Sequence, residues 1–303
     1  MRIGFGAPVS GSWATPAIVT EVAARADDLG YASLWSFQRL LFPEGTFLSE
    51  SYHSVLDPMV ALGYLAACTR RVRLGVAVVN VPFVSPVLLA KQAATIDTLS
   101  GGRLALGLGL GWAQEEFTAS GADTERRGAR AEEYIACLDA IFSGTPDFAG
   151  DFYRIPQAEV LPRPLQQPRP PILLGGTVPA ALRRAGRLAD GWISSSRTDL
   201  TAISGSIRTV RSAAQDAGRN PTAVQIVVRG VMKLGAAGGT DRTPLTGSAE
   251  QIRDDLTRLA EQGVDEVFLD LNFDPDIGNP AADPQASLAT AHRVLETFAP
   301  ASS

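Results

Sequence analysis

Short runs of apolar residues alternate with longer amphipathic stretches along the whole chain. The apolar runs have the length of strands, and several, such as VRLGVAVV, are apolar at both alternating positions, as in strands covered on both faces. Strands and helices that alternate with short connections predict a parallel sheet. We expect eight strands, the number that closes a (β/α)8 TIM barrel, at residues 3–6, 32–36, 72–79, 103–109, 172–175, 191–194, 224–229 and 264–271.

The predicted helices begin with one repeated device, a residue with a side-chain acceptor followed by proline. Such a side chain caps a free backbone N–H group, and proline at the first helical position loses no hydrogen bond. These starts are Thr15-Pro16, Asp57-Pro58, Ser85-Pro86 and Asp283-Pro284. Ser248 and Gln251 form a capping box before another helix, and Gly30, Gly101 and Gly263 mark helix ends. The signals support the alternation of strands and helices.

The composition is that of one globular domain, which we expect to cover residues 1–303. With 45% hydrophobic residues, the chain can fill a barrel core. Its net charge of −5 disfavours a nucleic-acid partner, and it contains no apolar run long enough to cross a membrane. Its two cysteines and two histidines have no metal-binding spacing, and its first residues form no export signal. We therefore expect a cytoplasmic protein without a metal site, whose partner is a small-molecule substrate.

Three connections are too long to be simple turns, at residues 36–56, 144–171 and 235–247. In a parallel barrel the loops that follow the strands build the active site, so long loops there are candidate lids. The first insertion follows a strand directly and is rich in aromatic residues, which places Phe37 and His53 at a substrate pocket. The second, with seven prolines, is either a lid or a plain surface connection. We expect the first and third insertions at the C-terminal rim of the barrel.

The segment GLGLGW, residues 107–112, resembles a dinucleotide-binding loop. The Rossmann fingerprint needs a third glycine where Trp112 stands, and the expected acidic residue on a following strand is not evident, so we reject a Rossmann site. The glycines either let the strand end pack tightly or clear space for a flat ring. In the second case Gly109 leaves room for the ring, and Trp112, Glu115 and Glu116 form its rim.

The stretch LLGGTVPAALRRAGRLADGWISSS, residues 173–196, carries the strongest signal for a ligand site. Gly175 and Gly176 end a strand, and we expect Thr177 to open a helix whose first N–H groups are free. Backbone donors at a helix N-terminus, with no side chain in the way, form a site for a phosphate or another anion. Ser194 and Ser195 end the next strand on the same side, where they either add hydroxyl donors or are simply solvated.

Together these motifs resemble the luciferase-like monooxygenase superfamily, and the resemblance covers nearly the whole chain. Its branch of coenzyme F420-dependent oxidoreductases is the more similar one. The segments that carry the resemblance are ASLWSFQRL, the run from VRLGVAVV to GLGLGWAQEEF, RRGARAEEYIACLDAIF and PPILLGGTVPAALRRAGRLADGW. Their order along the chain is more specific than any one of them. The resemblance implies a TIM barrel, usually a homodimer, that binds a flavin or deazaflavin ring at its C-terminal mouth.

The resemblance also implies roles for particular residues. It places a non-prolyl cis peptide between Ala77 and Val78, at the bulge of the third strand, where the bond presses against one face of the cofactor ring. Trp112 and Glu115 occupy positions that line the ring in related enzymes. The phosphate region of the cofactor is expected at Gly175, Gly176, Thr177 and Ser195, with Ser194 and Gly109 also at the cofactor.

One departure from the family concerns catalysis. After the tryptophan of the second strand, members commonly have an acidic residue followed by a histidine that is often credited with catalysis. Here Trp35 is followed by SFQR, so Gln38 and Arg39 stand in those places, and neither is a base near neutral pH. We assign Gln38 and Arg39 as catalytic residues that stabilise charge developing during hydride transfer. The alternative is that Arg39 points outward and pairs with Glu44.

The sequence therefore predicts an oxidoreductase that transfers hydride between coenzyme F420 and a small organic substrate. Reduction of an activated double bond or imine is favoured, because oxidation of an alcohol usually needs a base within hydrogen-bond reach. An FMN-dependent monooxygenase of the same fold is the first alternative, and a barrel that binds cofactor without turnover is the second. The substrate is expected to contact Trp13, Trp35, Phe37 and His53.

Overall fold

Eight parallel strands close into a barrel in the computed structural model, which describes residues 1–46 and 48–301. They are β1 (Arg2–Gly6), β2 (Ser33–Ser36), β3 (Arg73–Asn80), β4 (Leu104–Gly109), β7 (Ile172–Gly175), β8 (Gly191–Ile193), β9 (Gln225–Val231) and β12 (Glu266–Asp270). Around the barrel they pair in the order β1-β12-β9-β8-β7-β4-β3-β2. The predicted (β/α)8 fold is confirmed, and the ends of the predicted strands differ from the observed ones by at most two residues.

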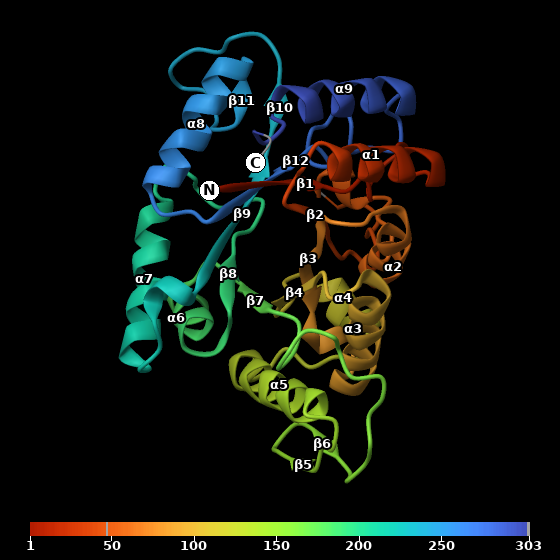
Figure 1. The fold of residues 1–303 in the computed structure, drawn as a ribbon, viewed down its shortest axis with the longest axis vertical. Coiled ribbons are helices and arrows are strands. Elements are labelled where there is room, and N and C mark those ends of the chain that lie inside the picture. The colour runs from red at the N-terminus through yellow and green to blue at the C-terminus, as the bar shows by residue number, and fades with distance from the viewer. Residues whose placement is uncertain (47, 302–303) are drawn as a thin grey trace.

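Helices between the strands cover the outside of the barrel. They are α1 (Pro16–Asp28), α2 (Pro58–Cys68), α3 (Pro86–Ser100), α4 (Gln114–Ala119), α5 (Arg127–Phe142), α6 (Pro179–Leu188), α7 (Ile203–Asp216), α8 (Ala249–Glu261) and α9 (Pro284–Thr297). Figure 1 shows α1, α2, α3 and α9 on one side of the strands and α6, α7 and α8 on the other. None of the described helices combines the length and the apolar character needed to span a bilayer.

The predicted helix starts are confirmed. Four side chains accept a hydrogen bond from a backbone N–H group in the first turn of the helix that follows, with proline at the start of the helix: Thr15, Asp57, Ser85 and Asp283. Ser248 and Gln251 make both hydrogen bonds of the capping box before α8. Each cap satisfies a backbone N–H group at the point where a loop passes into a helix of the outer layer.

The three long connections leave different ends of the barrel. Residues 36–56 follow β2 and residues 235–247 follow β9, so both extend from the C-terminal ends of strands, as predicted. Phe47 lies outside the described residues. The connection 144–171 joins α5 to β7, and its antiparallel hairpin of β5 (Phe148–Ala149) and β6 (Arg154–Ile155) lies beside α5 (Figure 1). Because this connection leads into the start of a strand, it is a surface excursion at the opposite rim, and the lid alternative is wrong.

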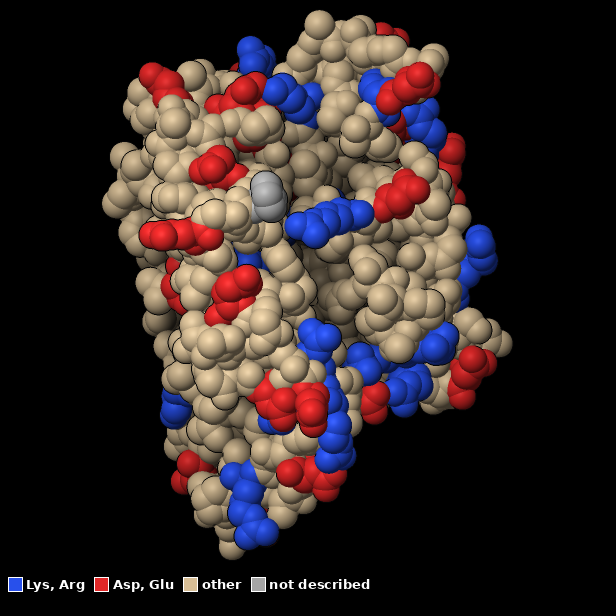
Figure 2. All heavy atoms as spheres, turned by 180° about the vertical axis from the view of Figure 1, so that it is seen from behind, with Lys and Arg blue, Asp and Glu red and all other residues tan. Residues whose placement is uncertain are grey.

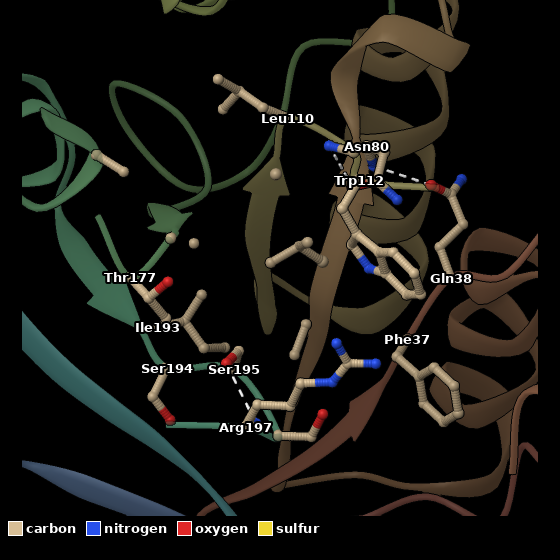
Figure 3. A pocket seen from close by; sticks show the side chains of 18 of the residues that line it. Phe37, Gln38, Asn80, Leu110, Trp112, Thr177, Ile193, Ser194, Ser195 and Arg197 are labelled. Carbon is tan, nitrogen blue, oxygen red and sulfur yellow. Dashed lines mark hydrogen bonds between the residues drawn. The ribbon is translucent and has the colours of Figure 1, made fainter. Parts of the chain in front are cut away.

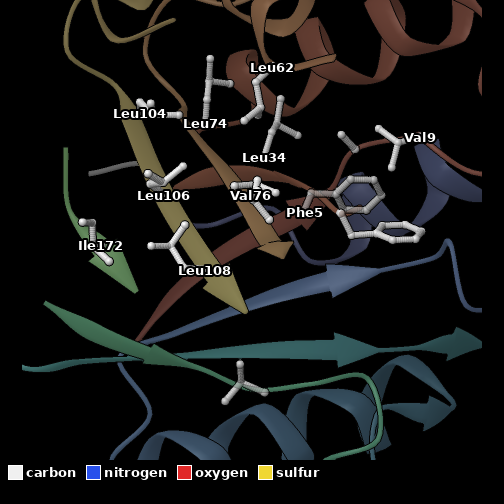
Figure 4. Close-up of a cluster of buried hydrophobic side chains, with 14 of the residues drawn as sticks. Phe5, Val9, Leu34, Leu62, Leu74, Val76, Leu104, Leu106, Leu108 and Ile172 are labelled. Atoms are coloured by element: carbon white, nitrogen blue, oxygen red, sulfur yellow. The ribbon is translucent and has the colours of Figure 1, made fainter. Parts of the chain in front are cut away.

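Apolar side chains between the strands and the helices form the larger part of the core. Figure 4 shows Leu34 of β2 and Leu74 of β3 next to Leu62 of α2, with Leu106 of β4 in the same cluster, and all four are fully buried. Burying a leucine side chain contributes roughly 1.5–3 kcal/mol, so this layer fixes the helices on the barrel wall.

A second, smaller cluster fills the inside of the barrel. In it Trp35 stacks on Phe268 with the ring centroids 5.3 Å apart. Gly75 on β3 leaves the space for this tryptophan, because a Cβ atom at Gly75 would lie 2.4 Å from the indole ring. The filled interior leaves the C-terminal ends of the strands as the place for a ligand.

Candidate active site

A cavity of about 680 Å³ opens at the C-terminal ends of β2, β3, β4, β7, β8 and β9. Its volume is within the roughly 300–1,000 Å³ that is usual for cofactor and substrate pockets. Figure 2 shows the hollowed face, with Lys or Arg side chains across and below the opening. Among the described residues no Asp or Glu lines the cavity, and its charged side chains are Arg39, Arg127, Arg184, Arg197 and Arg229. In a chain with a net charge of −5, this local positive charge favours an anionic occupant.

The bulge of β3 forms one side of the cavity. The peptide bond between Ala77 and Val78 is cis, as the family resemblance implied, and both residues line the cavity. Gly109 of β4 lies against this bulge, and a Cβ atom there would come within 2.4 Å of Cγ2 of Val78. Glycine at this position therefore lets β4 approach the bulge closely and keeps this part of the cavity free of a further side chain.

Gln38 is held at the end of β2 by a chain of hydrogen bonds. Its Oε1 accepts a hydrogen bond of 2.8 Å from the backbone N–H of Asn80 (Figure 3). The Oδ1 of Asn80 in turn accepts one of 3.0 Å from the N–H of Gly111. Because the carbonyl side of the Gln38 amide is used, its Nε2 group is the part available to a ligand.

Arg39 is buried against a carboxylate. Its side chain is 3% exposed, and its Nε lies 3.3 Å from Oε1 of Glu116, which is 1% exposed. The same oxygen accepts a hydrogen bond of 2.7 Å from the backbone N–H of Leu40. The alternative that Arg39 points outward to Glu44 is therefore wrong. Nε and Nη1 of Arg39 are fully enclosed and have no hydrogen-bond partner among the described residues, so Nη2 is the nitrogen that this arginine can offer to a ligand in the cavity.

Aromatic rings and guanidinium groups alternate along the wall next to Arg39. Its Cζ lies 4.8 Å from the ring centroid of Tyr52 and 4.6 Å from that of Trp112. From the other side of the cavity, Arg197 reaches over the ring of Trp112, with Cζ 5.2 Å from its centroid (Figure 3). Both residues line the cavity, and the ring of Trp112 is half-exposed.

Backbone donors without acceptors form an anion cradle after β7, made of Gly176, Thr177 and Val178. The φ angle of Gly176 is +140°, a region that favours glycine. Its carbonyl accepts a hydrogen bond of 2.8 Å from Nε1 of the buried Trp192. Since the C=O and N–H groups of a trans peptide point in opposite directions, this bond turns the Thr177 N–H away from the indole. None of the three N–H groups of the cradle has a hydrogen-bond acceptor in the part of the chain that is described.

The predicted helix start at Thr177 is wrong by two residues. The helix α6 begins at Pro179, and Val178 before it has an extended backbone and no side-chain cap. Valine gives no capping signal, so the start was assigned to the threonine instead. The correction keeps the N–H groups at the helix N-terminus free, and Gly175, Gly176 and Thr177 all line the cavity as predicted.

Ser194 and Ser195 both line the cavity but differ in how free their hydroxyl groups are. Oγ of Ser194 accepts a hydrogen bond of 2.9 Å from the backbone N–H of Arg229, which leaves its proton for another acceptor. Ser195 is used within its own turn, where its N–H donates to Oγ1 of Thr198 at 3.0 Å and its Oγ accepts from the N–H of Arg197 at 3.2 Å. Ser194 is therefore the freer donor.

Four residues assigned from the sequence lie outside the cavity. Trp13 is fully buried in the outer core, and Trp35 is enclosed within the barrel interior. His53 is exposed and contacts the ring of Phe42, with a centroid distance of 4.8 Å. Glu115 is also exposed, because successive residues of a helix point about 100° apart and the neighbouring Glu116 faces inward.

Several lining residues were not predicted. Tyr52 lines the cavity together with Phe37 of the same insertion, which was predicted, and Asn80 orients Gln38. Arg229 had a usable signal, since it stands at the C-terminal end of the predicted strand 224–229, where barrel active sites lie. Three further arginines line the outer part of the cavity and are called the mouth arginines below: Arg127, Arg184 and Arg197. The sequence around them gave no sign of a site, because only the folded barrel brings α5, α6 and the loop after β8 together.

Sequence comparison identifies relatives of the chain. Residues 3–237 match the model of the luciferase-like monooxygenase family. An uncharacterised protein of Mycobacterium tuberculosis is 34% identical over 242 residues, which cover 73% of this chain and 82% of that protein. The FMNH(2)-dependent dimethylsulfone monooxygenase of Pseudomonas putida is 36% identical over 154 residues, which cover 50% of this chain and 42% of that protein.

Solved structures of other proteins have the same fold. Monooxygenase RslO1 from Streptomyces bottropensis superposes with a TM-score of 0.80 at 23% identity, over 98% of each chain. An F420-dependent secondary alcohol dehydrogenase in complex with an F420-acetone adduct superposes with a TM-score of 0.77 at 16% identity, again over 98% of each chain. At these identities the similarity concerns the fold, whereas the family model matches most of the sequence. The chain therefore belongs to the luciferase-like monooxygenase family.

Proposed function

We propose that this protein is a two-electron oxidoreductase that holds coenzyme F420 at the barrel mouth and reduces a small organic substrate with an activated double bond or imine. The observation that carries the proposal is one cavity that combines a backbone anion cradle with a lining whose charged side chains are all arginine. When bound, the reduced deazaflavin supplies the hydride, and the protein supplies binding, orientation and electrostatic stabilisation. The F420-dependent dehydrogenase of the same fold supports the proposal.

The residues present fit the anionic parts of such a cofactor. The cradle offers free N–H groups, and a Cβ atom at Gly176 would lie 2.5 Å from Cβ of Ala181, so only glycine keeps this turn in place. The mouth arginines continue the positive charge outward from the cradle, and Arg127 and Arg197 are exposed. Coenzyme F420 carries a phosphodiester and tail carboxylates, whereas FMN carries one phosphate, so this extended positive lining favours coenzyme F420.

Gln38 and Arg39 are proposed to stabilise charge rather than to move protons. Nε2 of Gln38 and Nη2 of Arg39 are the donors left free by their contacts with Asn80 and Glu116. Donors held in place before the reaction stabilise negative charge that develops on a substrate oxygen or nitrogen. The aromatic wall beside them excludes water and so strengthens this interaction.

An FMN-dependent monooxygenase is the second candidate. It is favoured by the named activity of the Pseudomonas putida relative, which covers half of this chain. The same cradle suits the phosphate of FMN. A barrel that binds its cofactor without turnover is the third candidate, because neither Gln38 nor Arg39 is a general base.

The test of the proposal is a parallel titration of the full chain with coenzyme F420 and with FMN. In Gly176→Val the side chain clashes with Ala181 and disturbs the cradle, so we expect the affinity for the cofactor to fall by about a hundred-fold or more, as for the loss of two charge-assisted hydrogen bonds. The matched control is Gly218→Ala, which changes another glycine with positive φ but in open space. Thermal melting of both variants shows whether the barrel stays folded.

The outcomes of this test distinguish the candidates and check the position of the cofactor. Affinity for coenzyme F420, with single-turnover oxidation of the reduced coenzyme by enones or imines, supports the proposal. Tight FMN binding without affinity for coenzyme F420 favours the monooxygenase. Binding without turnover across the substrate panel favours the non-catalytic barrel. Unchanged affinity in Gly176→Val places the cofactor elsewhere.

We also propose that the protein is a homodimer that associates through α2 and α3. The sequence of α2, PMVALGYLAAC, contains no charged residue, and an apolar helix on the outside of a domain indicates an interface. Val60 and Tyr64 of α2 and Val87, Leu88 and Leu99 of α3 are exposed large side chains on these neighbouring helices.

A further inference from the structure

The guanidinium of Arg229 extends into the cavity from β9. A carboxylate binds its edge, and aromatic rings pack near its faces. Its Nε lies 2.7 Å from Oδ2 of Asp270, and the arginine side chain is 7% exposed. Its Cζ lies 4.7 Å from the ring centroids of both Phe37 and Phe273. The described residues offer no hydrogen-bond acceptor to its Nη1 and Nη2. The terminal amino groups are thus the free part of a buried cation that lines the cavity.

The carboxylate that clamps Arg229 is itself fixed. Oδ1 of Asp270 accepts hydrogen bonds from the N–H and from Nδ2 of Asn272, at 3.0 and 2.8 Å. Asn272 is held in turn by the backbone of the β1 end, through the N–H groups of Val9 and Ser10 at 3.2 Å and the carbonyl of Ala7 at 2.9 Å. With its orientation set in advance, Arg229 loses little conformational entropy when it binds a ligand.

Arg229 and the anion cradle belong to different strands of the barrel. The cradle follows β7, and around the barrel the order continues through β8, β9, β12 and β1 to β2. The guanidinium of Arg229 extends from β9 to the ring of Phe37 at the end of β2, whereas Thr177 of the cradle follows β7. Its contacts are therefore with residues other than those of the cradle.

We infer that Arg229 binds an oxoanionic group of the substrate, so that the substrate is an organic carboxylate or sulfonate. A guanidinium fork matches two oxygen atoms of such a group. Three of the five lining arginines have carboxylate partners, Arg39, Arg184 and Arg229, while Arg127 and Arg197 have none among the described residues. The excess of positive charge can hold an organic anion in addition to the phosphate. This inference rests on the proposed function and specifies its substrate class.

The experiment is calorimetric titration of the full chain with benzoate, benzenesulfonate and the neutral benzamide, both without cofactor and saturated with the cofactor that it binds. The variants are Arg229→Met and the double variant Arg229→Met with Asp270→Asn, which removes both buried charges and guards against misfolding. Arg25→Met is the matched control, because Arg25 forms an exposed ion pair with Glu296, and neither residue lines the cavity.

We expect the affinity for at least one of the two anions to fall by roughly ten- to a hundred-fold in both Arg229 variants, as for loss of a charge-assisted hydrogen-bonded pair. Binding of benzamide and of the cofactor should stay as in the unaltered protein, and Arg25→Met should change nothing. The anion that binds more tightly distinguishes a carboxylate from a sulfonate substrate.

Three results would overturn the inference. The first is anion affinity that persists in the double variant, and the second is an equal loss for benzamide, which would indicate a change of shape only. The third is a loss of cofactor affinity alone, which would assign Arg229 to the cofactor. If the unaltered chain binds neither coenzyme F420 nor FMN, the proposed function fails, but the titrations without cofactor still decide the role of Arg229.

Discussion

Replacing Glu116 with glutamine should destabilise the protein strongly, although the change removes only one charge. Oε1 of Glu116 lies 3.3 Å from Nε of Arg39, and the two side chains are 1% and 3% exposed. Glutamine retains a carbonyl oxygen that can accept the N–H of Leu40, so the perturbation is confined to the charge. What remains is a buried guanidinium without a counterion.

The magnitude follows from this burial. Removing one partner of a buried ion pair costs about 3–5 kcal/mol, whereas replacing both partners is often close to neutral. We therefore expect Glu116→Gln to lose about 3–5 kcal/mol of unfolding free energy, and the double variant with Arg39→Met to recover most of it. The control Glu132→Gln breaks the partly exposed pairs of Glu132 with Arg184 and Arg187 and should cost about 1 kcal/mol or less.

The assay is urea unfolding, followed by circular dichroism, of the unaltered protein and the three variants. The free energies of unfolding are compared provided that the slope of free energy against urea concentration is the same for all four. A loss in Glu116→Gln no larger than that of Glu132→Gln would refute the argument, since it would mean that Arg39 reaches solvent. A double variant as unstable as the single one would also refute it, because the cost would then come from packing and not from charge.

Two further predictions concern the cysteines and the proposed dimer. Burial raises the pKa of the Cys137 thiol to about 11, so the folded chain keeps this thiol protonated at pH 8. At that pH a thiol reagent should modify only Cys68 in the folded chain, and both cysteines in the chain unfolded in urea. Because the folded pKa is above the unfolded one, the contribution of Cys137 to stability is complete below the unfolded pKa and is lost as the pH rises through the folded one; modification of both thiols in the folded chain would contradict this. Val60→Lys together with Leu88→Lys should halve the mass measured by light scattering if α2 and α3 form the dimer interface, and an unchanged dimer mass would exclude that interface.

The pattern of apolar runs and helix starts along the chain was sufficient to predict the fold. Apolar runs covered on both faces and capped, proline-led helix starts are local features, and local features determine where strands and helices begin. The helix α6 shows the limit of this approach, because its start at Val178 and Pro179 has no side-chain cap and was assigned two residues early. The backbone cradle was still located, since it depends on two adjacent glycines at a strand end.

What only the tertiary structure decided is which side chains meet at the barrel mouth. Glu115 and Glu116 are neighbours in sequence, but the rotation between successive helical residues buries one beside Arg39 and exposes the other. Trp35 was expected at the substrate and instead fills the barrel interior, because Gly75 on the next strand leaves room for its ring. Arg229 and Asp270 stand 41 residues apart, and their contact exists only because β9 and β12 are adjacent in the closed barrel. The pattern of the sequence determines the elements, whereas the closure of the barrel determines their neighbours, since contacts between distant residues leave no local signal in the chain.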